Sequence, residues 1–208
     1  MKILGLLAGA ALLLGAQSAY AVTINNGSFE NGTNPGSFTT VGTAGTNIDG
    51  WTVDSGSVDY IGTYWTAASG NRSVDLSGGA PGSISQALSG LVDGVQYVLS
   101  FSIAGNPDGG EDPQLLTVSV GGVSSDFAAP KSPMTWAVQT FTFTYNAAGI
   151  GNDILRFAAN AANGAYGPAL DNITIAATPI PGAILLFGSA LGGMGFLGYR
   201  RKKLQAAA

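Results

Sequence analysis

The chain has 208 residues, with 12 acidic and 8 basic side chains and neither histidine nor cysteine. Charged residues make up 10% of it, against roughly 25% in an average soluble domain, and its 32 glycines are about twice the usual share of roughly 7%. Without histidine a Ser-His-Asp triad and His-ligated metals are excluded, and without cysteine so are disulfides, thiol nucleophiles and iron–sulfur clusters.

The first 21 residues have the pattern of a secretory signal peptide. Lys2 supplies one positive charge, an apolar run of about fourteen residues follows, and Ala19-Tyr20-Ala21 forms a small-x-small cleavage site. A membrane anchor is the alternative, but the run is shorter than the ~20 residues that span a bilayer. We therefore expect a signal peptide helix over residues 1–21, cleavage after Ala21, and export of the rest.

The middle segment, residues 22–177, is acidic and long enough for one domain with its own core. It holds all twelve acidic residues but only three bases, which gives a net charge of −9. Such a surface repels phosphate backbones, so nucleic acid is excluded as a partner. The charge suits either a domain that must stay soluble outside the cell or one that collects cations.

Apolar and polar residues alternate along this segment with a period of two, the pattern of half-buried strands. The clearest strands are expected around 97–103, 116–120 and 141–145, and shorter ones at 51–53, 57–61, 73–76, 83–88, 154–158 and 170–175. Glycine, proline, asparagine and aspartate separate them. Many short strands favour an antiparallel sandwich or jelly roll, and Trp51, within a Gly-Trp-x-Val strand, is expected in its core.

The C-terminal tail, residues 178–208, has the composition of a membrane span. Eighteen uncharged residues, 182–199, would measure ~27 Å as a helix, close to the ~30 Å hydrocarbon core of a bilayer. Arg200, Arg201 and two lysines follow directly, and such a cluster stays on the cytoplasmic side. A buried core helix is the alternative, but it would not explain these charges. We expect a transmembrane helix over 182–199, with the basic cluster 200–203 inside.

The same tail contains a Pro-x-Pro motif, formed by Pro179 and Pro181 around Ile180, and an arginine cluster, formed by Arg200 and Arg201. These features resemble the sorting signal of PEP-CTERM proteins, which has glutamate between the two prolines. The resemblance implies processing by an exosortase-type enzyme in a Gram-negative bacterium. The protein would be tethered to the inner membrane through its C-terminal helix and then reach the cell surface or extracellular matrix.

Seven short motifs follow one another along the middle segment. They are Asn26-Gly27-Ser28-Phe29-Glu30, Ile48-Asp49-Gly50-Trp51-Thr52-Val53, Gly56-Ser57-Val58-Asp59-Tyr60-Ile61, Ser73-Val74-Asp75-Leu76, Gly82-Ser83-Ile84-Ser85-Gln86, Ala104-Gly105-Asn106-Pro107 and Gly167-Pro168-Ala169-Leu170-Asp171-Asn172-Ile173. Together they resemble the choice-of-anchor C family, a relative of a plant cell-wall domain of unknown function. The resemblance implies a galactose-binding-like β-sandwich, with polysaccharide as the expected ligand.

Glu30 and Asp171 are a candidate structural calcium site. The first and last strands of such sandwiches lie close together, and similar carbohydrate-binding modules that open with an Asn-Gly-x-Phe-Glu-like motif carry calcium there. Ca²⁺ takes 6–8 oxygen ligands, so loop carbonyls would complete the site. In the alternative interpretation both carboxylates cap turns through backbone N–H groups. Asp108, Glu111 and Asp112 are a second cation candidate, although their spacing fits a solvated turn better than an EF-hand.

Tyr60, Tyr64 and Trp65 are the candidate sugar-binding residues. They cluster within six positions beside the polar turn 69–72, so a sugar ring could stack on them while polar groups bind its hydroxyls. Core packing is the alternative for Tyr64 and Trp65, because large aromatic side chains dominate burial. Trp136 and Tyr166 are isolated.

The sequence favours a binding module over an enzyme, because none of its acids sits in a recognisable catalytic motif. Two other functions stay open. One is a structural or adhesive surface protein without a specific sugar site, and the other is a secreted hydrolase. Exposed rings beside a groove would favour sugar binding, whereas buried rings under a flat polar surface would favour the structural role. Two carboxylates facing each other across a cleft would favour a hydrolase.

Overall fold

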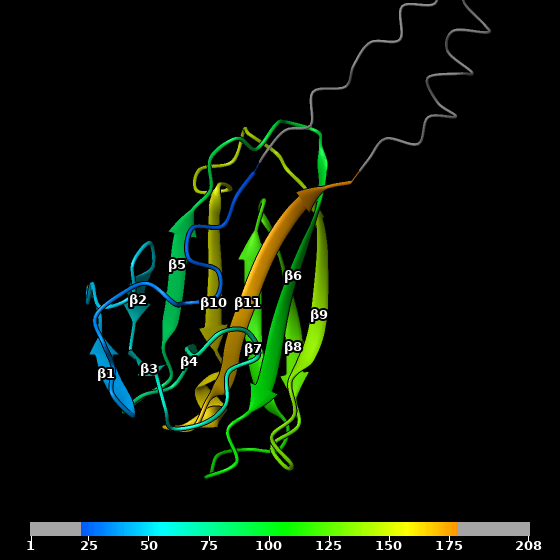
Figure 1. Ribbon diagram of the computed structural model, residues 1–208. Coiled ribbons are helices and arrows are strands. Elements are labelled where there is room, and N and C mark those ends of the chain that lie inside the picture. Colours follow the sequence, from blue (N-terminus) through cyan, green and yellow to red (C-terminus); the bar gives the residue numbers. More distant parts are fainter. Residues whose placement is uncertain (1–21, 179–208) are drawn as a thin grey trace, which may run out of the picture.

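A computed structural model describes residues 22–178 of the chain. The expected signal peptide, the transmembrane helix 182–199 and the sorting motif with Pro179, Pro181, Arg200 and Arg201 lie outside the described residues. The described part is an antiparallel β-sandwich, as the strand pattern predicts, with a six-stranded sheet packed on a five-stranded one (Figure 1). Between residues 22 and 178, no helix has the length and apolar character needed to cross a membrane.

Each sheet mixes strands from both halves of the chain. The six-stranded sheet has the order β1 (Phe38–Gly42), β3 (Ser57–Ile61), β4 (Ser73–Asp75), β11 (Pro168–Ala177), β6 (Gln96–Gly105) and β9 (Ala137–Thr144). The five-stranded sheet has the order β2 (Thr52–Ser55), β5 (Ser83–Ala87), β10 (Ile154–Ala159), β7 (Gln114–Val120) and β8 (Val123–Ala129). One short 3₁₀ helix, η1 (Ala161–Asn163), precedes β11.

Nine of these strands coincide with segments expected from the sequence, and β1 and β8 do not. Both lie at the edge of a sheet. An edge strand has a neighbour on one side only, so it buries fewer side chains, and β8 is exposed or half-buried at every position except Ala129. With little apolar burial to mark it, its alternation is weak.

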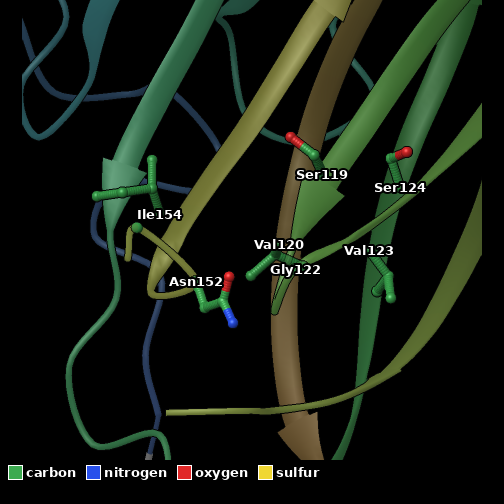
Figure 2. A pocket seen from close by; sticks show the side chains of 8 residues that line it. Ser119, Val120, Gly122, Val123, Ser124, Asn152 and Ile154 are labelled. Carbon is green, nitrogen blue, oxygen red and sulfur yellow. The ribbon is translucent and has the colours of Figure 1, made fainter. Parts of the chain in front are cut away.

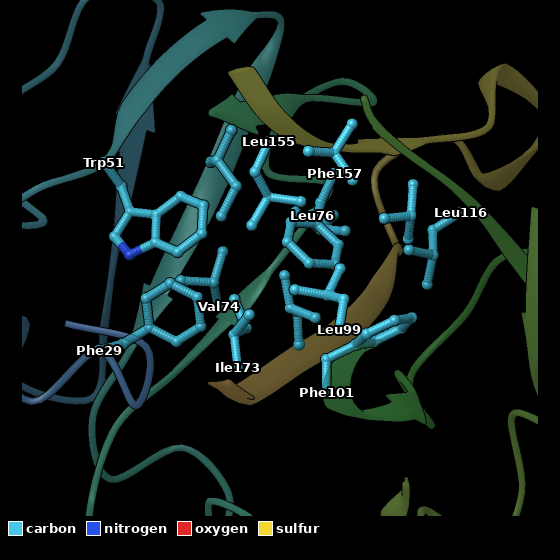
Figure 3. Close-up of a cluster of buried hydrophobic side chains, with 14 of the residues drawn as sticks. Phe29, Trp51, Val74, Leu76, Leu99, Phe101, Leu116, Leu155, Phe157 and Ile173 are labelled. Atoms are coloured by element: carbon cyan, nitrogen blue, oxygen red, sulfur yellow. The ribbon is translucent and has the colours of Figure 1, made fainter. Parts of the chain in front are cut away.

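The core lies between the two sheets and is rich in aromatic rings (Figure 3). Trp51 is 4% exposed, which confirms its expected place in the core. Its ring lies 5.5 Å from that of Phe29 and 6.1 Å from that of Phe157, and its Nε1 donates a hydrogen bond of 3.1 Å to the Asn26 carbonyl oxygen. The bulky rings are therefore packed in contact while the one indole N–H is satisfied, as burial of tryptophan requires.

The segment before β1 closes against β11, the last strand. The Ile173 amide donates a 2.8 Å hydrogen bond to the Gly27 carbonyl. A Cβ at Gly27 would lie 2.1 Å from the Ile173 carbonyl oxygen, so this close approach requires glycine. Phe29 is fully buried, and the Asn26 side chain ties the turn together by binding the Asn31 and Asp49 carbonyls. The opening motif is thus explained by its contact with the end of the chain.

Candidate functional site

Tyr60 is a core residue, which corrects its expected place in a sugar-binding cluster. Its side chain is fully buried. The Tyr60 hydroxyl donates to the Phe29 carbonyl oxygen at 2.6 Å and accepts from Arg72 Nη1 at 2.7 Å. The period of two along β3 explains the difference, because Val58 and Tyr60 face the core while Asp59 between them faces outward.

Tyr64 and Trp65 lie in the loop 62–72, which joins β3 to β4. Tyr64 is 48% exposed, and its hydroxyl donates a 2.6 Å hydrogen bond to Asp108 Oδ2. Trp65 is half-buried and is fixed by a 2.8 Å hydrogen bond from its Nε1 to Ser73 Oγ. The two rings meet edge to face with centroids 5.5 Å apart. Tyr64 thus offers a ring to solvent, and Trp65 supports it.

These two rings line a small pocket of about 100 Å³. Phe38, from β1, and Tyr166, from the segment between η1 and β11, bring two further rings, which are 46% and 43% exposed. Three carboxylates and one carboxamide supply the polar part of the lining, from Asp59, Asp75, Asp108 and Asn106. Ile61 and Ala165 complete the lining. The pocket therefore combines aromatic faces with hydrogen-bonding groups.

Asp75 and Asp59 occupy directly opposed positions on the neighbouring strands β4 and β3. Asp75 is 1% exposed and accepts three N–H hydrogen bonds, from Ser77 and Gly167 on Oδ1 and from the Asn106 side chain on Oδ2. Burial raises the pKa of Asp75 to about 7 in spite of these donors, and the charge of Asp59 adds to the increase. Burial also raises the pKa of Asp59, which a hydrogen bond from Thr40 partly offsets.

The sequence identified Tyr64 and Trp65 as sugar-binding candidates and Asp108 as a cation candidate, but it did not show that they share a pocket with the other lining side chains. Asp59 and Asp75 carried a usable signal, because each is a charged residue at the outward position of an expected strand. Phe38 lies on the edge strand β1, which the pattern did not predict. Tyr166 and Asn106 come from loops more than fifty residues apart, and local spacing does not show that they meet.

The hydrogen bond from the Ile173 amide to the Gly27 carbonyl confirms that the two ends of the domain meet, and the charge of Glu30 contributes to a raised pKa of Asp171. Burial is the larger cause and brings this pKa to about 6. Both carboxylates also bind the loop 62–72. Glu30 Oε1 accepts the amides of Asn71 and Arg72 at 2.7 and 2.8 Å, and Asp171 Oδ2 accepts that of Ser69 at 2.8 Å.

The donor chemistry at this pair suits a hard cation such as Ca²⁺. The two carboxylates bind neighbouring amides of the loop 62–72, and within residues 22–178 Glu30 Oε2 accepts no hydrogen bond. The turn-capping contacts of the alternative interpretation are present as well. The described residues contain no group of three or more acidic side chains that could hold a metal, so backbone carbonyls would have to supply the other ligands.

The acidic loop after β6 has structural contacts. Asp108 accepts the Tyr64 hydroxyl, and its own amide donates to Asn106 Oδ1 at 2.9 Å. Asp112 Oδ1 accepts the Lys131 amide at 3.0 Å. The carboxylates of Asp108 and Asp112 are thus used to shape the loop, and Asp108 belongs to the aromatic pocket.

A larger hollow of about 280 Å³ lies at the β7–β8 turn (Figure 2). Asn152 and Ser119 are among its lining residues, which also include valine, glycine and isoleucine. It has no aromatic ring on which a sugar could stack and no charged group for acid–base chemistry. The smaller aromatic pocket is therefore the better candidate site in spite of its size.

The fold and this pocket together define an antiparallel β-sandwich with an aromatic and acidic pocket at one end of its six-stranded sheet. Residues 22–176 match the family described as "Protein of unknown function (DUF642)". The match covers most of the chain, and the protein belongs to this family.

Comparison with known proteins gives one curated relative and several solved structures. Halomucin of Haloquadratum walsbyi (strain DSM 16790 / HBSQ001) is 33% identical over 186 residues, which cover 87% of this chain but 2% of that protein. An arabinose-bound α-L-arabinofuranosidase matches with a TM-score of 0.51 at 13% identity, over 78% of this chain and 27% of that one, and shares the fold. A Family 16 Carbohydrate Binding Module-2 has a TM-score of 0.49 at 20% identity, over 73% and 97% of the two chains.

Proposed function

We propose that residues 22–177 form a binding module for polysaccharide. The observation that carries this proposal is the pocket in which Tyr64 and Tyr166 expose their rings beside three carboxylates and a carboxamide. Ring faces pack against the C–H faces of a sugar, and the oxygen and nitrogen atoms around them bind its hydroxyls. Small-molecule sites in general combine such an apolar lining with a few placed polar groups.

The size of the pocket indicates how much of a polysaccharide it holds. Its volume of about 100 Å³ is well below the ~300–1,000 Å³ of pockets for drug-sized ligands. We therefore propose that it takes one sugar residue, at a chain end or side branch, with the rest of the polymer outside.

Binding without catalysis is the proposal for this pocket. A glycosidase needs two carboxyl groups that can transfer a proton and attack the sugar or activate water. Asp75 is 1% exposed, and three N–H donors hold its carboxylate in place. Such an acid is poorly placed to move protons or attack a substrate, so a hydrolase is the less favoured function.

Affinity electrophoresis of residues 22–177 in gels containing soluble polysaccharides tests this function. Tyr64→Ala is expected to remove the retardation, whereas Tyr64→Phe keeps the ring and should keep most of it. Ile150→Ala is the matched control, because Ile150 is fully exposed and lies outside the pocket. If no polysaccharide retards the wild-type protein, the alternative of a structural or adhesive surface protein without a sugar site is correct.

We propose further that the protein is exported and sorted as its ends suggest. The signal-like residues 1–21, the Pro179/Pro181 motif and the basic cluster at Arg200 and Arg201 support secretion, a temporary tether in the inner membrane and release by an exosortase-type enzyme to the cell surface or matrix. Mass spectrometry of the mature protein tests both cuts. A mature chain that begins at Met1 would refute removal of the signal peptide, and one that ends at Ala208 would refute cleavage by the exosortase-type enzyme.

A structural calcium ion at Glu30 and Asp171 is part of the same proposal. Its support is the position of the two carboxylates, which bind neighbouring amides of the loop 62–72 where the opening segment meets β11. When bound, the ion would neutralise them and connect both to the loop 62–72, which carries Tyr64 and Trp65. It would thereby stabilise a domain that has no disulfide.

A further inference from the structure

The arrangement of Asp59 and Asp75 is unusual for a β-sheet. They are direct cross-strand partners, and both line the aromatic pocket. Like charges directly opposite each other on neighbouring strands destabilise a sheet. One of the two, Asp75, is also buried, which makes its charge more costly. A sheet that keeps two opposed carboxylates in a pocket has a place for a positive charge.

The described part of the chain does not supply that charge. Its three bases are used elsewhere: Arg72 binds the Tyr60 hydroxyl at 2.7 Å, Lys131 Nζ binds the Gly110 carbonyl at 3.3 Å, and Arg156 pairs with Asp54 at 3.3 Å. None of the three lines the pocket. Asp75 Oδ2 accepts only one hydrogen bond from residues 22–178, although a carboxylate oxygen can accept about two.

The rim of the pocket indicates which kind of cation fits. Metal ions such as Ca²⁺ and Mg²⁺ require several oxygen ligands at once, and within residues 22–178 no three acidic side chains are placed so that they could hold a metal together. Four aromatic side chains line the pocket together with the carboxylates, and the Phe38 and Tyr64 centroids lie 5.4 Å apart. Ring faces attract organic ammonium groups, and cages of this kind recognise them in other proteins.

We propose that this pocket binds an amino sugar through its protonated amine. This specificity rests on the polysaccharide-binding function proposed above and narrows its ligand to one class. The ammonium group lies against the half-buried Asp59, the buried charge of Asp75 beside it adds to the attraction, and the sugar ring packs on Tyr64 and Tyr166. Uronic acids and sulfated sugars are rejected, because their charge repels the three pocket carboxylates. The raised pKa of Asp75 agrees with a carboxylate that has no counter-charge in the unbound protein.

Two ligands of identical backbone test the proposal by isothermal titration calorimetry. A β-1,4-linked glucosamine oligomer and the cello-oligosaccharide of equal length differ in the amine, which replaces one hydroxyl in each unit. We expect the glucosamine oligomer to bind roughly tenfold more tightly, the effect of one ion pair with cation–π contacts. The N-acetylated oligomer, which has lost the charge, should bind no better than the cello-oligosaccharide.

Variants connect this preference to the pocket. Asp59→Asn should reduce the preference for the amine to less than about threefold. Asp126→Asn, which removes an exposed carboxylate on β8 of the other sheet and outside the pocket lining, should leave the preference unchanged. Far-ultraviolet circular dichroism shows whether each variant is folded.

Each contrary outcome is distinct. Equal affinity for the charged and neutral oligomers, or tighter binding of a uronate oligomer, would refute amine specificity and leave polysaccharide binding intact. Calcium binding that Asp59→Asn abolishes would place a metal in the pocket and also overturn the proposal. Absence of binding to any polysaccharide in the electrophoresis experiment would refute the proposed function itself.

Discussion

Removing the charge of Asp75 is expected to change how the stability of the domain depends on pH. Burial raises the pKa of Asp75 from its ordinary value of 3.8 to about 7. The folded state therefore binds this proton more tightly than the unfolded state. The resulting stability is fully present below about pH 4 and is lost as the pH rises through about 7.

The magnitude follows from the size of the shift. Each pKa unit corresponds to 1.36 kcal/mol, so Asp75 alone lowers the free energy of unfolding by roughly 3 kcal/mol between pH 4 and 7. About 1 kcal/mol of this falls between pH 6 and 7. Asp171, with a pKa raised to about 6, acts in the same direction but mostly at lower pH. The change in the free energy of unfolding between pH 6 and 8 therefore reports mainly on Asp75 in the pocket.

Urea unfolding of wild type and Asp75→Asn at constant ionic strength, with chelator present, measures this effect. The asparagine cannot titrate, so its stability should be nearly constant between pH 6 and 8. The substitution also costs about 1–2 kcal/mol at all pH values, because an N–H group then faces the Asn106 side-chain donor. Asp126→Asn serves as an exposed control. Parallel pH profiles for wild type and Asp75→Asn would refute the reasoning.

Three further predictions concern stability. Gly27→Ala should lower the free energy of unfolding by at least about 2 kcal/mol, because the new Cβ would lie 2.1 Å from the Ile173 carbonyl oxygen. The control Gly42→Ala places its Cβ in open space, so this variant should be as stable as wild type or up to ~1 kcal/mol more stable. Equal denaturant midpoints for the two variants would contradict this prediction. Gln86→Leu removes three hydrogen bonds to backbone groups and should cost about 2–3 kcal/mol in the same assay. Calcium at a hundredfold excess over Kd should raise the free energy of unfolding by about 2.7 kcal/mol, which appears as a higher melting temperature. Glu30→Gln should abolish this increase. Identical melting curves of the wild-type protein in calcium and in chelator would refute the calcium proposal.

The fold was predictable because its central strands carry a strong burial signal. In β6, Tyr97, Leu99 and Phe101 are fully buried, whereas Val98 and Ser100 between them are half-buried. This alternation is a local property that the sequence displays directly. The order of strands is not local. β4 lies between β3 and β11, which is nearly a hundred residues away, and no spacing in the sequence indicates that neighbour.

The site was predictable only in part, for the same reason. Tyr64 and Trp65 are adjacent in sequence, so their proximity could be inferred, whereas Tyr166 reaches them only through the fold. Tyr60 is close to Tyr64 and Trp65 in the sequence, but it is fully buried and does not share their pocket. Its place on β3, one residue from the outward Asp59, determines its direction instead.

Contacts of β11 and of Gly167 directly before it connect the aromatic pocket with the proposed calcium site. The Gly167 amide binds Asp75 in the pocket at 3.0 Å, and Asp171, four residues further on, binds the Ser69 amide in the loop 62–72. Calcium at Glu30 and Asp171 would therefore restrain the loop that presents Tyr64. Ordering a loop before the ligand arrives reduces the entropy that binding must offset. The chelation experiment consequently has a second expected result, weaker retention by polysaccharide, even at temperatures where the domain stays folded. Unchanged retention after chelation would show that Tyr64 is held by its own contacts, chiefly the hydrogen bond to Asp108, and that the calcium site serves stability alone.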